Sequence, residues 1–232
     1  MQKKEKKMAK NNKIANEVKK EFEQRAYTFE IRAEEKDGEG IITGRPIVYN
    51  QRTDIGGWFE EVIDSGALDA ADLTDVRFLV NHDMRKIPLA RSRRNNGNST
   101  MQFSIDPEGM RLDWVKLDIK SNPEAAALYS AVSRGDITGM SFCFSVKGEK
   151  WDNLDTDYPT RHITEIGKVV EVSAVTFPAY EATTINARGK EALESARSAV
   201  ETARQQKAAN VETKAKEELE LEKAKFYFKN QK

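Results

Sequence analysis

The spacing of the apolar residues changes twice along the chain, which divides it into three segments. The first segment is lysine-rich, and Ile14, Val18 and Phe22 follow one another at intervals of four, as on one face of a helix. The middle segment opens with YTFEIRAEE, where apolar and polar residues alternate as in a half-buried strand. The last is rich in Ala, Glu, Lys, Arg and Gln, and it contains no proline. We therefore expect a helical N-terminal extension over residues 1–24, one folded domain over 25–187 and a charged helical tail over 188–232.

The middle segment reads as a strand-rich α+β domain. Strands are predicted at GRPIVYN, VRFLVNHD, STMQFSID, GMRLDWVKLDI, ITGMSFCFSVKGEKWD and HITEIGKVVEVSAVTFP. Asp106-Pro107-Glu108-Gly109 is a turn signal between two of them. Helices are predicted at WFEEVIDSGAL, with Asp64 and Ser65 as caps for the residues that follow, and at NPEAAALYSAVSRGD, with Pro123 in the first turn.

Composition argues against several classes of partner and cofactor. The chain has 38 basic and 38 acidic residues, so no net charge draws it to nucleic acid or to an anionic membrane. Its apolar stretches are interrupted by charge and fall short of the ~20 residues that span a bilayer. One cysteine and two histidines make neither a disulfide nor a Cys/His zinc site. We expect a cytosolic protein without cofactors, whose chemistry comes from its side chains.

Two residues have positions that suit catalysis. His82 ends the apolar run FLV and precedes a polar stretch, at the point where a buried strand emerges. Ser141 opens an apolar strand after Gly135 and Gly139, where backbone N–H groups can approach a substrate. Each also fits an ordinary structural residue at a strand end. The Gly-x-Ser-x-Gly elbow is absent, because Cys143 stands two residues after the serine.

The remaining conspicuous residues have structural explanations. Cys143 shares its strand face with Ser141 and reads as a small packed residue. The basic cluster of Arg85, Lys86, Arg91, Arg93 and Arg94 reads as a solvated loop, with a substrate-facing role as the alternative. In the tail, Leu193, Ala196, Val200 and Ala203 form an alanine-rich seam that fits either a solvated helix or a self-association helix.

In their order and spacing, FLVNHD, DITGMSFCF and VVEVSAVTFPAY resemble the prohead protease family of tailed phages. GRPIVYN and WFEEVIDSGAL match the usual entry to that family, and the resemblance covers roughly residues 29–187. The fold of the family is similar to that of the herpesvirus capsid-maturation proteases. The resemblance thus implies a mainly antiparallel, β-barrel-like core with a few surrounding helices.

The resemblance also implies a serine endopeptidase with Ser141 as nucleophile and His82 as base. Glu171, in the VEVS strand, corresponds to the acidic residue that orients the histidine. His162 is the rival for that place, because the third member in the herpesvirus relatives is a histidine on a strand after the serine. A carboxylate suits the task better, since it stabilises the imidazolium formed during acyl transfer.

The substrates that the resemblance implies are the scaffold or the scaffolding segment of the major capsid protein, and the protease itself. The expected place of action is the host cytoplasm, inside the assembling prohead. The helical tail would bind scaffold or be removed by autocleavage, and self-association is expected from the dimeric herpesvirus relatives. The competing hypothesis is a catalytically inactive, capsid-associated scaffold or assembly protein that binds coat protein with the same fold.

Overall fold

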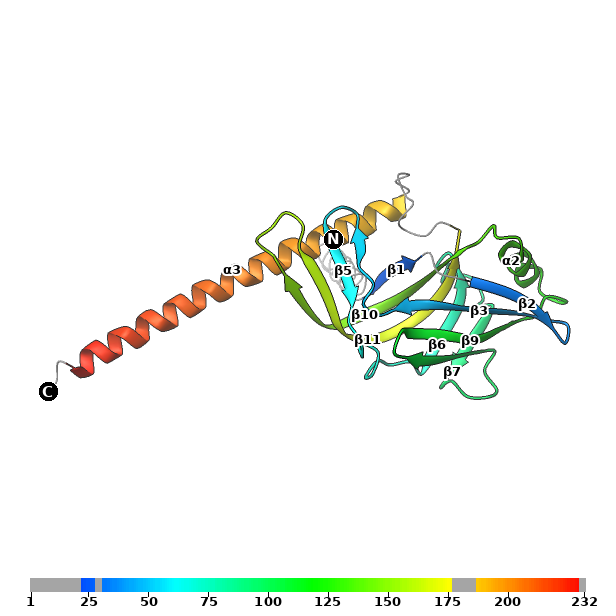
Figure 1. Ribbon diagram of the computed structural model, residues 1–232, viewed down its shortest axis with the longest axis horizontal. Coiled ribbons are helices and arrows are strands. Elements are labelled where there is room, and N and C mark those ends of the chain that lie inside the picture. Colours follow the sequence, from blue (N-terminus) through cyan, green and yellow to red (C-terminus); the bar gives the residue numbers. More distant parts are fainter. Residues whose placement is uncertain (1–21, 28–30, 177–186, 230–232) are drawn as a thin grey trace, which may run out of the picture.

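The computed structural model of the chain describes residues 22–27, 31–176 and 187–229, and its strands form two sheets (Figure 1). The first sheet has seven strands, of which five follow the order β1-β10-β11-β5-β4, while β6 pairs with β11 and with β7. Its strands are β1 (Glu23–Tyr27), β4 (Thr53–Ile55), β5 (Phe59–Ile63), β6 (Asp75–Val80), β7 (Ala90–Arg93), β10 (Gly139–Asp152) and β11 (Thr160–Val175).

The second sheet is antiparallel and has the order β2-β3-β9-β8. Its strands are β2 (Ile31–Lys36), β3 (Glu39–Val48), β8 (Met101–Asp106) and β9 (Gly109–Leu117). The predicted turn at 106–109 joins β8 to β9 as a hairpin. Gly109 is required there, because its φ is +129° and a Cβ would lie 2.1 Å from the carbonyl oxygen of Ile47.

The core lies between the two sheets and is closed by one helix. Ile42, Met110 and Leu112 from the second sheet meet Phe78 and Phe142 from the first, all of them fully or almost fully buried. Helix α2 (Pro123–Ser133) adds its buried side chains Ala125, Leu128 and Val132 to the same cluster. Asn122 caps this helix, since its side-chain oxygen accepts from the amides of Glu124 and Ala125.

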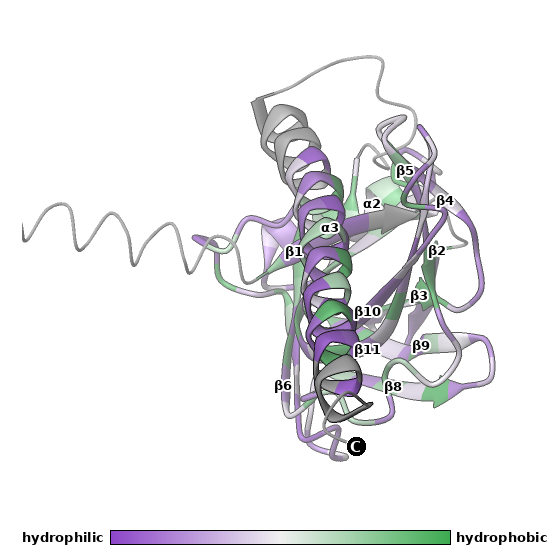
Figure 2. Cartoon of the chain, turned by 90° about the vertical axis from the view of Figure 1, so that its left-hand side faces the viewer, coloured by the Kyte–Doolittle hydropathy of each residue, from purple (hydrophilic) through white to green (hydrophobic). Residues whose placement is uncertain are grey.

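Helix α3 (Ala187–Lys229) runs alongside the first sheet and extends well beyond it (Figures 1 and 2). Val200 packs on Phe59, whose ring meets Trp151 edge-on with the centroids 5.0 Å apart. Arg204 Nη2 donates to the carbonyl oxygen of Thr156 over 2.7 Å. These contacts attach the first half of α3 to the folded body of the protein. No helix in the described ranges has the length and apolarity that crossing a bilayer requires.

Most of the predicted strands and the helix at 123–133 are confirmed, two expectations need correction, and a third falls mostly outside the described residues. The core is not barrel-like, because the described strands form two separate sheets with no closed barrel, and one sheet is mixed, with β5 and β6 parallel to β11. The helix predicted at 58–68 is wrong: residues 59–63 form β5, since pairing with β4 and β11 buries Phe59, Val62 and Ile63. The expected N-terminal helix falls mostly on residues 1–21, outside the described residues, and its last two residues belong to β1.

Buried charges attach β1 to the rest of the first sheet. Arg25 Nε lies 2.5 Å from Glu61 Oε1, and Arg161 Nη1 lies 2.7 Å from Glu23 Oε2. Arg161 also contacts Glu149. Arg161 and Glu61 are 3% and 1% exposed, so breaking these pairs would leave charges buried without partners.

We predict that acid loosens β1. Burial by itself raises the pKa of Glu23, but Arg25 and Arg161 outweigh it and hold this pKa at about 2, below its ordinary value of 4.5. A carboxyl whose pKa falls on folding contributes its full stabilisation above its unfolded pKa and loses it as the pH falls toward the folded pKa. Amide hydrogen exchange in β1, corrected for the intrinsic rate, should therefore rise between pH 4.5 and about 2. In Glu23→Gln the exchange should be faster at neutral pH and depend less on pH; an unchanged pH dependence would contradict the assignment.

Candidate active site

His82 lies in a tight turn at the end of β6. Asn81 and His82 have φ values of +52° and +57°, a left-handed conformation that asparagine tolerates and histidine adopts at a cost. The Asn81 side chain holds the turn against the end of β11, donating to Thr176 Oγ1 and accepting from the Thr176 amide, each over 3.0 Å. The His82 amide donates to Ser173 Oγ over 3.1 Å. Asn81 and the His82 amide thus attach this turn to the end of β11 and to the residue after it.

The ring of His82 meets the carboxylate of Glu171. Nδ1 of His82 lies 2.5 Å from Oε1 of Glu171, which is fully buried on β11. The second carboxylate oxygen, Oε2, accepts from Ser173 Oγ over 2.5 Å. Because an ionised carboxylate only accepts, Nδ1 of the neutral ring carries the proton and Nε2 keeps its lone pair. Nε2 can therefore act as a base, and Glu171 orients it.

Ser141 lies beside this cluster, on β10. Its cross-strand partner on β11 is Ser173, so both side chains emerge on the sheet face that also carries Glu171. Opposed residues of this kind have Cβ atoms about 4.5–5.5 Å apart, and diagonal ones about 7–8 Å. Ser141 is fully buried, and its hydroxyl donates to the carbonyl oxygen of Arg25 over 2.7 Å. Within the described ranges, its hydrogen bond thus goes to β1 and not to His82.

Cys143 follows on the same face, opposite Glu171. Burial, and then the negative charge of Glu171, raise the pKa of its thiol to about 12. The thiol is therefore neutral at physiological pH and does not have the thiolate character of a nucleophilic cysteine. Phe142 and Phe144 alternate with it and are fully buried, with their ring centroids 4.7 Å apart.

His162 occupies a different part of β11. Its Nδ1 lies 2.7 Å from Asp64 Oδ1, and its Nε2 lies 3.3 Å from Asp152 Oδ2. Nine residues separate it from Glu171 along the same strand, about 30 Å at 3.3 Å per residue. The structure thus brings Glu171 to His82, and it places the rival histidine elsewhere.

The basic cluster after His82 is largely neutralised by nearby carboxylates. Arg85 pairs with Asp83 over 3.0 Å, and Lys86 pairs with Glu124 over 2.7 Å. Arg91 pairs with Asp75. No group of His, Cys, Asp and Glu side chains within the described ranges could hold a metal ion.

Ser173 and Asn81 belong to the site but were not predicted from the sequence. Ser173 accepts from the His82 amide and donates to Glu171, while Asn81 holds the turn against Thr176. Strand alternation could have placed Ser173 on the same face as Glu171, because it follows Glu171 by two residues. The role of Asn81 depends on β6 and β11 ending side by side, which is not visible in the sequence.

Comparison with known proteins decides the family. The model of the caudovirus prohead serine protease family matches residues 27–197, which include both sheets except the first four residues of β1. The chain belongs to this family. Membership identifies it as a phage prohead protease of the serine type, which acts in the assembling capsid within the host cell. No curated protein and no solved structure gives a significant match.

We predict that His82 is held in one tautomer. At a pH where the imidazole is neutral, ¹⁵N NMR should show a protonated Nδ1 and an unprotonated Nε2. His162→Gln leaves a single histidine in the chain and so assigns the signals. In Glu171→Gln the two tautomers should mix, because the amide can donate as well as accept. A protonated Nε2 in the unaltered protein would contradict the orienting role of Glu171.

Proposed function

We propose that the chain is a serine endopeptidase of phage capsid maturation, with Ser141 as nucleophile, His82 as general base and Glu171 as the orienting carboxylate. The contact of His82 Nδ1 with buried Glu171, on the sheet face that carries Ser141, is the observation that supports it most directly. A histidine–carboxylate pair beside a serine is the arrangement that acyl transfer requires. Membership of the prohead serine protease family supports the same conclusion.

The reaction would proceed through an acyl-enzyme. Nε2 of His82 takes the hydroxyl proton of Ser141 while Oγ attacks the carbonyl carbon of the peptide bond. The C–N bond then breaks, and His82 returns the proton to the departing amine. Water, deprotonated by His82, hydrolyses the resulting ester and restores the serine. Buried Glu171 stabilises the imidazolium in both halves of the reaction.

The proposed substrates are the scaffold or the scaffolding segment of the major capsid protein, and the protease chain itself. Family membership supports this choice, and so does the exposure of residues 208–223 in α3. Contacts with the folded body reach Lys207, which lies 3.6 Å from Asp155. Residues 208–223 are all exposed, and among them Val211, Leu219 and Leu221 are more than half exposed. This stretch is available to bind scaffold, to associate with another copy or to be cleaved.

The alternative is an inactive, capsid-associated assembly protein with the same fold. The observation in its favour is that Ser141 is fully buried and that its hydroxyl bonds to a backbone carbonyl. Co-expression with the coat protein of the same phage separates the two hypotheses. The protease hypothesis predicts that mass spectrometry finds shortened coat or scaffold protein, whereas unchanged masses support the assembly protein.

We predict that Ser141→Ala abolishes this processing while the protein still folds and associates with shells. The change removes only a hydroxyl whose partner is the carbonyl oxygen of Arg25. The circular dichroism spectrum of the variant serves as the control for folding. Continued cleavage by Ser141→Ala would remove this serine from the mechanism.

Replacement of the two candidate third members should give very different results. Glu171→Gln should lower turnover by about 10⁴-fold, as the loss of the orienting carboxylate does in other triads. His162→Gln should lower it less than tenfold, because His162 contacts Asp64 and Asp152 rather than His82. Steady-state cleavage of one peptide substrate by both variants makes the comparison, and the reverse order of effects would exchange the two assignments.

A further inference from the structure

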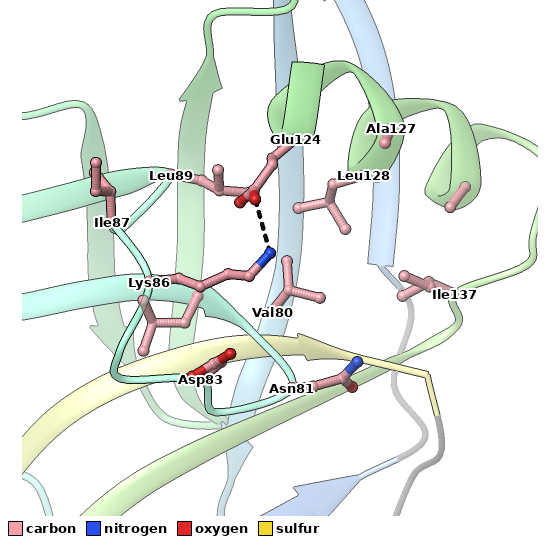
Figure 3. Close-up of a pocket in the computed structure, with 12 residues that line it drawn as sticks. Val80, Asn81, Asp83, Lys86, Ile87, Leu89, Glu124, Ala127, Leu128 and Ile137 are labelled. Carbon is pink, nitrogen blue, oxygen red and sulfur yellow. Dashed lines mark hydrogen bonds and ion pairs between the residues drawn. The ribbon is translucent and has the colours of Figure 1, made fainter. Parts of the chain in front are cut away.

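A cavity of about 410 Å³ lies between the turn that carries His82 and helix α2 (Figure 3). Its apolar lining comes from the end of β6, from the segment before β7, from α2 and from the segment between α2 and β10. These residues are Leu79, Val80, Ile87, Leu89, Ala127, Leu128, Ala131 and Ile137. The volume falls within the range of roughly 300–1,000 Å³ that is usual for ligand pockets.

The lining of the cavity includes chain neighbours of His82 and a residue of the segment that leads to Ser141. Asn81 and Asp83, which flank His82 in the chain, both line it. Ile137 lines it as well, four residues before Ser141. A polypeptide whose scissile bond lies at Ser141 and His82 would therefore pass close to its mouth.

The charges around the cavity are paired with one another. Lys86 forms an ion pair with Glu124, drawn as a dashed line in Figure 3, with 2.7 Å between Nζ and Oε1. Asp83 pairs with Arg85. Because these charges are already paired, they would attract a charged side chain of a substrate only weakly. Ile87 lines the cavity and is 86% exposed, and Met84, next to Asp83, is 53% exposed. Apolar side chains so exposed beside an apolar cavity favour an apolar ligand.

We propose that this cavity takes an apolar side chain of the polypeptide substrate, near the scissile bond. The inference rests on the proposed function and gives that site its substrate preference. Burying a Leu, Ile, Phe or Met side chain contributes about 1.5–3 kcal/mol, which corresponds to a preference of roughly 10-fold to 150-fold over a small polar residue.

Ala127→Trp tests the proposal. Ala127 is exposed at the mouth of the cavity, so an indole there can enter it without displacing core residues. A positional-scanning library of internally quenched peptides measures the preference at each substrate position. The unaltered protein should prefer apolar residues at one position by at least about tenfold, and Ala127→Trp should reduce this to under about threefold. Ser133→Trp, exposed on the same helix outside the cavity, should retain the preference.

Labelling with a small fluorophosphonate, which reacts with activated serines, distinguishes a failure of the proposed subsite from a failure of the proposed function. Labelling of Ser141 at equal rates in the unaltered protein and in Ala127→Trp, with the preference lost only in the variant, supports the cavity as a subsite. Labelling without an apolar preference at any position, or with a preference unchanged in Ala127→Trp, overturns the subsite alone. Absence of Ser141 labelling both from the unaltered protein and from Glu23→Lys, a change that weakens the attachment of β1, overturns the proposed function itself.

A second inference rests on a different observation, the contact of β1 with the nucleophile strand. The Cα of Ala26 pairs with that of Ser141, and the neighbouring carbonyl of Arg25 accepts the Ser141 hydroxyl. A hydroxyl that donates to this carbonyl cannot at the same time donate to Nε2 of His82, since it has one proton. Moreover, all of β1 except its last residue, Tyr27, precedes the family match, which begins at residue 27.

We infer that β1 is an inhibitory strand, which must separate from β10 before Ser141 can attack. Ion pairs attach β1 to the sheet and can act as the restraint: Arg25 pairs with the buried Glu61, and Glu23 pairs with the buried Arg161. Release of β1 removes the competing acceptor and exposes the serine. This inference also rests on the proposed function, and it explains how a protease of this family can have a buried nucleophile.

A disulfide across the two strands tests the inhibitory role. Gln24 is the cross-strand partner of Cys143, the sole cysteine, and opposed residues of antiparallel strands have Cα atoms about 4.5–5.5 Å apart, within the disulfide range. Oxidised Gln24→Cys should lose fluorophosphonate labelling by at least about tenfold relative to the reduced form, and dithiothreitol should restore it. Equal labelling of the oxidised and reduced forms would overturn the inhibitory role.

Glu23→Lys provides the opposite perturbation. A lysine beside Arg25 and Arg161 replaces attraction with repulsion and should speed the labelling of Ser141 by at least about tenfold. Glu39→Lys, at an exposed position of β3, is the matched control and should label at the unaltered rate. If folded Glu23→Lys labels no faster than this control, the inference fails.

Discussion

The hydrogen bonding of β11 is the constraint on which the arrangement of the molecule depends. A central, buried strand must find partners for its peptide groups on both sides. β10 lies along one side, from Thr160 to Val175. On the other side, β5 pairs in parallel with residues 160–163 and β6 with residues 171–174. Since β6 and β11 run in the same direction and end together, the turn after β6 meets the last part of β11. His82 and Glu171, 89 residues apart, come into contact for this reason.

The two faces of this sheet contribute different things. Phe78, Phe142 and Val172 point into the core and supply apolar burial. The opposite face carries Ser141, Ser173 and Glu171, which are equally buried but polar. Such groups destabilise a fold unless they are hydrogen-bonded, and here each has a partner. The polar face is therefore satisfied before any substrate arrives, and catalysis would require its hydrogen bonds to rearrange.

The proposed inhibitory strand and the proposed subsite lie on different borders of the candidate site. β1 lies on the outer edge of β10, where it holds the hydroxyl that would attack. The cavity lies beyond the turn after β6, where a substrate side chain would be recognised. One border would thus control whether the serine can react, and the other which polypeptide reaches it.

Local patterns in the sequence were sufficient for most secondary structure. Alternation of apolar and polar residues predicted β9 and β11, and the Asp106–Gly109 turn predicted a hairpin, because these signals are read from neighbouring residues. Residues 59–63 show where such patterns fail. Their spacing fitted a helix, yet Phe59, Val62 and Ile63 gain more by pairing with β11 and entering buried positions.

The sequence by itself determined the family, through the order and spacing of the segments around His82, Ser141 and Glu171. The tertiary structure alone decided which residue faces the histidine. Glu171 and His162 lie on the same strand, and only the register of β6 on β11 brings the first to His82 and leaves the second beside Asp64. It also decided that Ser141 donates to Arg25 of β1. The physical reason is that pairing between distant strands depends on the hydrogen-bond requirements of the whole sheet, which no local pattern contains.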